Sequence, residues 1–290
     1  MRRIVIVKRS VLLLYLLIFC FVFIGGVGFA AASVYQNVAV DKKEGKQLPV
    51  LMYHSILKNK KAAGKYVISP EVLEADLKYL RDNGYTTVLS ADLIAYENGQ
   101  ADLPEKPIMI TFDDGYLNNL TYALPLLEKY DMKAVISIVG SFSERFSINK
   151  DPNPNYAHLS WEEIRQLADT GRIEIGNHTY AMHAQSPRKG CAKKRGESDA
   201  EYRKALIEDI TKTQQLLKEN CGIEPTIFTY PFGSVCNDSL PIIAEMGFKV
   251  SLSCCEKNNV LTRESDDLLL MCRFNRPSGI STEKFMQRIL

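Results

Sequence analysis

Two adjacent carboxylates, Asp113 and Asp114, follow a buried apolar run and precede a glycine in the stretch ITFDDGYLNN. Two anions side by side at a strand end repel each other, so the pair needs a compensating partner. A bound cation can neutralise one carboxylate while its neighbour stays ionised nearby as a general base. The pair therefore indicates metal-assisted proton transfer, although an adjacent Asp pair taken alone is more often a solvated turn.

Two of the four histidines, His178 and His183, lie in the stretch GNHTYAMHAQ after another apolar run. A spacing of five puts them on no common helix face, so we expect a loop that follows a strand and aims both imidazoles at one ion. Two histidines and one carboxylate form a catalytic zinc arrangement when a vacant position lets water bind and lose a proton near neutral pH. A histidine pair on a loop is mostly surface, and it is the joint occurrence with the Asp pair that favours a metal site.

These groups must be positioned by the strands that precede them. From Pro49 onward, apolar runs alternate with helical periods, without internal repeats. This alternation predicts parallel strands with helices outside, in a barrel or an open doubly wound sheet, and chemistry at the carboxyl ends of the strands. The strands are expected at 49–54, 85–89, 107–112, 133–139, 172–178, 225–231 and 248–253. The helices are expected at 69–84, 118–130, 161–171, 199–220 and 239–247, with short ones from Ser90 and Thr282.

The first residues of the chain have a different composition. Four basic residues precede an uncharged apolar span from Val11 to Ala32. As a helix rising about 1.5 Å per residue, this span would reach about 33 Å, enough to cross a hydrocarbon core of about 30 Å. The positive flank predicts a cytoplasmic N-terminus and an exported remainder. An uncleaved anchor is favoured over a cleaved signal peptide, although GFAAAS at 28–33 offers small residues for a peptidase.

The predicted organisation is a basic cytoplasmic segment at 1–10, a transmembrane segment at 11–32, a linker at 33–48 and an exported domain at 49–290. Since the chain ends at Leu290, soon after its last helix begins, no second binding module is expected, and we expect a monomer. Taking the four leader cations away from the net charge of +2 leaves the remainder near −2, so nucleic acid is a poor candidate partner.

Six of the seven cysteines lie in the expected exported domain. An oxidising compartment allows disulfides, and we expect at least one, whose connectivity the sequence leaves open. A zinc cluster is disfavoured because no CxxC spacing occurs. The six are Cys191, Cys221, Cys236, Cys254, Cys255 and Cys272.

The stretches TFDDGY, HTYAMH and TYPFG resemble, in this order, the motifs of the polysaccharide deacetylase family. This family is also called carbohydrate esterase family four or the NodB-homology domain, and the match covers about Pro49 to Ile289. The resemblance implies a distorted, TIM-like (β/α) barrel and metal-dependent removal of N-acetyl groups from sugars. It also implies that Asp113 is the catalytic base and Asp114 a metal ligand. The other two implied ligands are His178 and His183.

The chain departs from the family pattern in the histidine spacing and in the third motif. Many members space the two histidines by four, which would land on Met182; the spacing of five is similar to exported poly-N-acetylglucosamine deacetylases. Many members carry an arginine that holds the base, where this chain has Thr229. Arg273 and Arg276, in CRFNRPSG, are the candidates to replace it, with a surface structural role as the alternative.

The expected late catalytic histidine is also missing, because no histidine follows His183. By resemblance to the same branch, His54 at the end of the first strand is the candidate general acid, with a structural histidine as the alternative. His158, on a polar loop, is expected to be structural.

The resemblance leaves the substrate and the metal open. Zinc is favoured, with cobalt or nickel as alternatives, and the glycan is peptidoglycan or poly-N-acetylglucosamine, with a slight preference for cell-wall glycan. Two rival functions are a catalytically silent carbohydrate-binding relic and a metal amidohydrolase acting on another amide. For each aromatic residue near the site, the alternative to substrate contact is a place in the hydrophobic core. The residues expected to contact substrate are Tyr116, Trp161, Tyr180, Pro231, Phe232 and Gly233.

Overall fold

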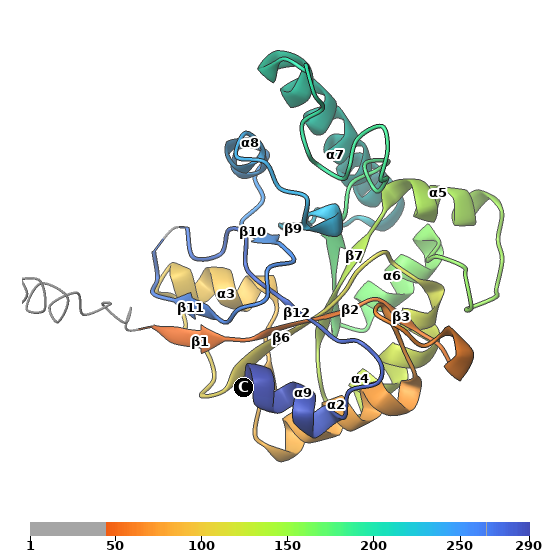
Figure 1. Cartoon of the computed structure of the whole chain (residues 1–290), viewed down its shortest axis with the longest axis vertical. Helices are drawn as coiled ribbons and strands as arrows, with labels where there is room; N and C mark the ends of the chain where they lie inside the picture. The colour runs from red at the N-terminus through yellow and green to blue at the C-terminus, as the bar shows by residue number, and fades with distance from the viewer. Residues whose placement is uncertain (1–44, 265) are drawn as a thin grey trace, which may run out of the picture. The chain divides into compact units, whose positions relative to one another are not determined.

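A parallel sheet of eight strands forms the centre of the fold (Figure 1). The computed structural model describes residues 45–264 and 266–290. The strands follow the order β10-β9-β8-β7-β6-β2-β12, and β5 pairs with the start of β6. Their bounds are Val50–Tyr53 (β2), Thr86–Thr87 (β5), Pro107–Phe112 (β6), Ala134–Ile138 (β7), Ile173–Asn177 (β8), Ile227–Thr229 (β9), Val250–Leu252 (β10) and Phe274–Asn275 (β12).

The sheet curls until its two edges approach each other. Leu252, at the end of β10, forms a parallel bridge with Met271, and three residues later the chain enters β12, which pairs with β2. The segment Met271–Asn275 therefore links the two edge strands. A closure made by one bridge and a two-residue strand gives a distorted barrel, which confirms the predicted α/β class with parallel strands.

The alternation of side chains along β6 decides which groups face the site. Ile108, Ile110 and Phe112 pack outward into the core shared with the surrounding helices. Met109 lies on the opposite face, in a separate cluster inside the barrel. Because successive residues of a strand point to opposite faces, Asp113 continues the inward row.

Helices cover the outside of the sheet, and most of them agree with the predicted positions. Ser69 caps α2 by accepting a hydrogen bond from the Val72 backbone N–H, and Ser160 and Glu163 form the expected capping box at α6. Figure 1 shows α9 lying beside α2, so the last helix closes over the first part of the fold. The helices are Pro70–Asp82 (α2), Ser90–Glu97 (α3), Leu124–Lys129 (α4), Gly140–Ile148 (α5), Trp161–Asp169 (α6), Asp199–Cys221 (α7), Ser239–Glu245 (α8) and Thr282–Ile289 (α9).

Two helical regions differ from the sequence prediction. The continuous helix expected at 118–130 begins instead as a π-helical turn, Asn119–Ala123 (η2), and becomes α-helical only at α4, whose second residue is Pro125. Proline lacks the N–H that an α-helical ladder would need there. Helix α5 was not predicted, because its sequence carries few apolar residues in a helical period.

Two pairs of short strands at the rim of the barrel were also not predicted from the sequence. Lys46–Leu48 (β1) pairs antiparallel with Asn259–Leu261 (β11), and Ser55–Ile56 (β3) pairs with Val67–Ile68 (β4). The compact unit Gly45–Leu290 includes β1, which lies before Pro49. This strand was not expected because it is polar and is held by a strand more than 200 residues away, so local sequence carries no signal for it. Single 3₁₀ turns occur at Lys60–Ala62 (η1) and Pro231–Gly233 (η3).

The basic segment, the predicted membrane span and most of the linker, residues 1–44, lie outside the described residues. Within residues 45–264 and 266–290, no helix has both the length and the apolar character needed to cross a bilayer.

A disulfide joins Cys255 to Cys272 and confirms the expectation of at least one. It ties the chain leaving β10 to the chain entering β12, and next to it the Arg273 N–H donates to the Cys255 carbonyl at 2.8 Å. The bond therefore fixes the backbone from which Arg273 extends. The other cysteines of the described region are free thiols, namely Cys191, Cys221, Cys236 and Cys254.

Candidate active site

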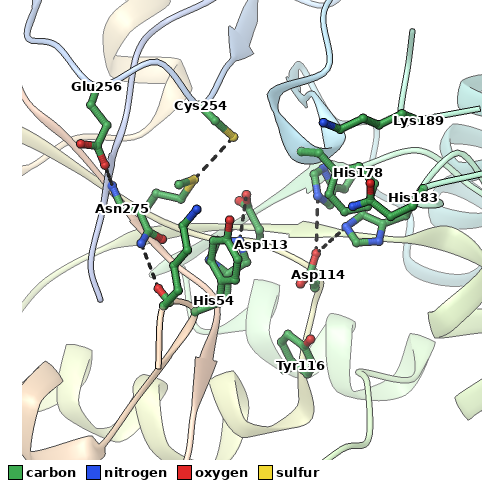
Figure 2. A pocket seen from close by; sticks show the side chains of 15 residues that line it. His54, Asp113, Asp114, Tyr116, His178, His183, Lys189, Cys254, Glu256 and Asn275 are labelled. Carbon is green, nitrogen blue, oxygen red and sulfur yellow. Dashed lines mark hydrogen bonds and ion pairs between the residues drawn. The ribbon is translucent and has the colours of Figure 1, made fainter. Parts of the chain in front are cut away.

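A cavity of about 630 Å³ opens at the carboxyl ends of the strands (Figure 2). Its wall includes all three predicted ligands, the predicted base and the predicted acid, from segments that follow β2, β6 and β8. Parallel strands bring their carboxyl ends to one edge, and this is why residues far apart in sequence meet here. The five are His54, Asp113, Asp114, His178 and His183.

The Asp113 carboxylate lies in the barrel interior, 2% exposed, and is held by Arg273. The guanidinium donates two hydrogen bonds, Nη1 to Oδ1 at 2.7 Å and Nη2 to Oδ2 at 2.8 Å. Burial alone would raise the pKa of Asp113, but the charge and hydrogen bonds of Arg273 outweigh it and lower the pKa. Asp113 is therefore ionised and fixed in orientation at neutral pH.

Asp114 turns away from its neighbour because its backbone is left-handed, with φ 72°. Gly115 follows at φ 64°, where a Cβ would come within 2.9 Å of the Ile138 side chain, so only glycine fits. A left-handed residue other than glycine costs on the order of 1 kcal/mol or more and is kept where the surroundings impose it. The turn sends the two carboxylates to different partners, Asp113 to Arg273 and Asp114 to the histidines.

The imidazoles of His178 and His183 both face Asp114 (Figure 2). Their Nε2 atoms lie 3.5 Å and 2.9 Å from Asp114 Oδ1. The three residues each offer one ligand atom, and these three atoms all lie within 4.8 Å of one another. One carboxylate oxygen and two imidazole nitrogens are the donor set of a catalytic divalent-metal site.

The tautomer of His178 supports this assignment. Its Nδ1 lies 2.7 Å from the Thr229 carbonyl oxygen, which can only accept, so Nδ1 carries the proton. In the neutral ring, Nε2 then presents a lone pair towards Asp114 Oδ1, an atom that is buried without a hydrogen-bond partner in the described chain. A lone pair facing a buried carboxylate oxygen calls for a cation between them, so the residues fit a metal.

The Asp114 carboxylate and the two imidazoles affect one another's pKa. Burial would raise the pKa of Asp114, but its interactions with the adjacent His178 and His183 rings bring the pKa well below its usual range. Burial would lower the pKa of His183, and the Asp114 carboxylate raises it instead. The carboxylate is therefore available as an anionic ligand.

His54 lies on the other side of Asp113, with its Nε2 3.9 Å from Asp113 Oδ2. The pKa of His54 is lowered: burial is the largest influence, and it acts against the charges of Asp113 and Asp114, which raise the pKa. Its Nδ1 is buried and has no hydrogen-bond partner among the described residues. His54 thus stands in the cavity beside the base, where a substrate atom could meet both.

The loop carrying the two histidines is held by a residue that sequence analysis missed. Asp209 on α7 accepts from the backbone N–H groups of Tyr180 and Ala181, at 2.7 and 2.9 Å. Thr179 adopts φ 72°, which lets the chain reverse between His178 and His183. A carboxylate in the middle of a long helix gives no local sign of this task.

His158 is structural, as expected, but lies closer to the site than its polar loop indicated. Its Nδ1 is 2.9 Å from the Asp114 carbonyl oxygen, and its ring stacks against Tyr116 at 4.6 Å between centroids. It is buried among two phenylalanine rings as well. His158 therefore supports the turn that orients Asp114.

The two candidate arginines have separate places. Arg273 holds Asp113, whereas Arg276 donates to Asp76 on α2, with Nε to Oδ2 at 2.7 Å. Arg273 and Arg276 lie on either side of the two-residue strand β12, and strand alternation sends one inward and the other outward. The expectation that Arg276 belongs with the catalytic residues is corrected: it anchors α2 to the loop after β12.

The expected substrate contacts are only partly at the cavity. Tyr116 and Phe232 line it, and the Phe232 ring lies 4.6 Å from the His183 ring. Trp161 is instead packed in the helical core, and Tyr180 points to Glu144 with Lys212 over its ring, so neither lines the cavity.

Pro231 and Gly233 also stay out of the lining and shape the turn that presents Phe232. Phe232 takes φ 58° there, and a Cβ on Gly233 would meet the Cys254 Cβ at 2.6 Å. Eight further lining residues were not predicted. Among them are Tyr66, Glu256 and Asn275, each of which lies beside a very short strand or in a loop.

The family model of the polysaccharide deacetylases matches residues 100–251 of the chain. The poly-beta-1,6-N-acetyl-D-glucosamine N-deacetylase of Escherichia coli K12 is 24% identical over 242 residues, which cover 77% of this chain and 35% of that protein. The enzyme of the same name from Staphylococcus aureus MRSA252 is 27% identical over 203 residues, or 70% of this chain and 65% of that protein. The chain thus spans about a third of the length of the first relative and just under two thirds of the length of the second.

Several solved structures share the fold, and two of them serve as examples. A de-N-acetylase from Aggregatibacter actinomycetemcomitans superposes with a TM-score of 0.72 at 24% identity, covering 83% of this chain and 99% of that one. IcaB from Ammonifex degensii gives a TM-score of 0.67 at 24% identity, covering 84% and 96%. At this identity the likeness concerns the fold alone.

Proposed function

Since this chain belongs to the polysaccharide deacetylase family, we propose that it hydrolyses N-acetyl groups on the sugars of an extracytoplasmic polysaccharide. The observation that carries the proposal is the juxtaposition of the Asp114, His178 and His183 cluster with the Asp113–Arg273 pair in one cavity. The extracytoplasmic location rests on the apolar leader and its basic flank, and with it we propose a membrane-anchored monomer.

A divalent cation bound by the cluster would polarise the acetamide carbonyl and make water easier to deprotonate. Zinc is the proposed metal, because an aspartate and two histidines suit it. The attacking water would give its proton to the Asp113 carboxylate, which Arg273 holds in place. The backbone N–H at Phe232 is the proposed donor to the developing oxyanion, an interaction whose loss commonly costs about 3–4 kcal/mol.

His54 is the proposed acid. Collapse of the tetrahedral species breaks the carbon–nitrogen bond, and the leaving nitrogen needs a proton to depart as an amine. His54 borders the cavity 3.9 Å from Asp113, so one substrate can contact both groups. The products are acetate and a free glucosamine unit in the chain.

We propose poly-N-acetylglucosamine as the polymer, in preference to the cell-wall glycan that the sequence slightly favoured. Support comes from the relatives named as poly-beta-1,6-N-acetyl-D-glucosamine N-deacetylases and from the early catalytic histidine.

The test is acetate release by the full-length protein from β-1,6-linked N-acetylglucosamine oligomers and from peptidoglycan, with zinc, with cobalt and with chelator. We expect release from the oligomers, lost with chelator and reduced at least about 100-fold in Asp114→Asn. Asp102→Asn is the control, because Asp102 is exposed and pairs with Arg263 at the surface. Metal bound without release from any glycan would favour a binding relic or another amide substrate.

Removing the support of the histidine loop should weaken metal binding without touching a ligand. Asp209→Asn replaces one acceptor oxygen by an NH₂ that cannot accept from the Tyr180 or Ala181 N–H. We expect the affinity for zinc, measured by competition with a chelating dye, to fall about 10–100-fold, as for other supporting residues of metal sites. Glu208→Gln is the matched control, because Glu208 is the exposed neighbour on α7; equal affinities in the two variants would contradict the role of Asp209.

A further inference from the structure

The wall of the cavity next to His54 contains an amide that lacks a partner. Asn275, at the end of β12, is 7% exposed and lines the cavity. Its Oδ1 is buried and has no hydrogen-bond partner within residues 45–264 and 266–290. A buried acceptor left unpaired destabilises the site, so the site gains by receiving a donor.

The orientation of this amide is fixed by its other contacts. Its Nδ2 donates to the Lys65 carbonyl at 2.9 Å, and a carbonyl oxygen requires the donor end of the amide there. The backbone N–H of Asn275 is engaged with Glu256 Oε1 at 3.3 Å. A flipped side-chain amide would bring two oxygens together at Lys65, so the side chain keeps its orientation and Oδ1 remains free to accept a hydrogen bond. Figure 2 shows Asn275 and Glu256 on the side of the cavity away from Asp114 and its two histidines.

An exposed aromatic ring stands at the same side. Tyr66 is 47% exposed, lines the cavity, and has its ring centroid 4.7 Å from that of His54. Lys65 Nζ lies over this ring, 5.0 Å from its centroid, on a long flexible side chain, so a ligand that stacks on the half-exposed ring takes the place of the ammonium group. Asn275 Oδ1 is an uncharged acceptor. The nearby Glu256 carboxylate already has a cationic partner, because its Oε2 lies 3.7 Å from Arg288 Nη2. The site therefore suits a neutral donor better than an ammonium group.

A neutral hydroxyl donor combined with an apolar C–H face is the surface of a pyranose ring. We propose that Tyr66 and Asn275 form a sugar subsite: Tyr66 stacks on the ring that bears the reacting nitrogen, and Asn275 Oδ1 accepts from one of its hydroxyl groups. This inference rests on the proposed function for its ligand. His54 borders the subsite, which places the leaving nitrogen next to the proposed acid.

The subsite is tested by calorimetric titration of a β-1,6-linked N-acetylglucosamine pentasaccharide into the full-length, zinc-loaded protein. All variants carry Asp113→Asn, so that the ligand keeps its acetyl groups. We expect Tyr66→Ala and Asn275→Ala each to weaken binding about five- to tenfold, and Tyr66→Phe to change it less than twofold. Tyr156→Ala is the matched control, because Tyr156 is 54% exposed and lies outside the cavity lining.

Unchanged affinity in Tyr66→Ala and Asn275→Ala, or no binding of the pentasaccharide at all, would overturn the subsite. Should Asn275→Ala unfold, the difference between Tyr66→Ala and Tyr66→Phe decides, because that side chain is half exposed. Acetate release by the unaltered protein separates the two proposals. Release with normal binding in both alanine variants removes the subsite and keeps the reaction, whereas weakened binding without release keeps the subsite and removes the reaction.

Discussion

Replacing Asp113 by asparagine is expected to lower kcat for acetate release by about 10³-fold or more and to leave the zinc affinity within about threefold of the unaltered protein. Asparagine keeps the shape of the side chain and an oxygen for Arg273, but it cannot take a proton from water. The metal site should persist, because Asp114 turns away from Asp113 at φ 72° and the three ligand atoms do not include Asp113. Acetate release and metal content are measured on the same preparation.

Two comparisons give this result its meaning. Asp114→Asn should lose both zinc and activity, whereas Asp113→Asn should lose activity alone, so the pair of variants separates the base from the ligand. Asp102→Asn, at the exposed ion pair with Arg263, should behave like the unaltered protein. If Asp113→Asn retained more than a tenth of the activity, Asp113 would not be the base and the mechanism would fail.

The residues predicted from sequence are those whose signal is local. Asp113, Asp114 and His178 follow apolar runs that form strands, and His183 lies on the loop after the second of these strands. The carboxyl ends of parallel strands meet at one edge. The conformation that makes the adjacent carboxylates compatible could not be read from sequence, because a left-handed φ at Asp114 is imposed by the surrounding fold. The glycine that follows was the only visible hint of it.

The partner of Asp113 shows where local signals end. Arg273 and Arg276 flank a strand of two residues, too short to show alternation, so the sequence could not say which faces inward. The choice is made by the pairing of β12 with β2 and by the disulfide between Cys255 and Cys272. Both contacts join segments that only the folded chain brings together.

The same limit explains the unpredicted cavity residues. Tyr66 precedes a two-residue strand, and Asn275 ends another, so neither lies in a segment with a recognisable period. Trp161 and Tyr180 were expected at the substrate because aromatic rings can stack on sugars, but Trp161, the first residue of α6, packs in the hydrophobic core. Burial, and not residue type, decided which rings face the cavity.

Arg273→Met should leave the Asp113 carboxylate buried without its counter-charge. Breaking a buried ion pair by removing one partner typically costs about 3–5 kcal/mol of the free energy of unfolding, which denaturant titration measures. With Arg273 present, the lowered pKa of Asp113 stabilises the fold above the unfolded-state pKa of about 3.9, and this contribution is lost as pH falls through the folded-state pKa. Without Arg273, burial dominates, the pKa rises, and the sign of the pH dependence reverses.

The activity profile should move with that pKa. The base must be ionised to accept a proton, so the acid limb of kcat/KM in Arg273→Met is expected at higher pH than in the unaltered protein. Arg276→Met is the matched control: Arg276 is also a buried arginine, 2% exposed and paired with an aspartate, but its partner Asp76 lies on α2. It should lose comparable stability and keep the acid limb in place. If both variants lose stability and neither shifts the limb, Arg273 serves only the fold, and another group must hold Asp113 in its ionised form.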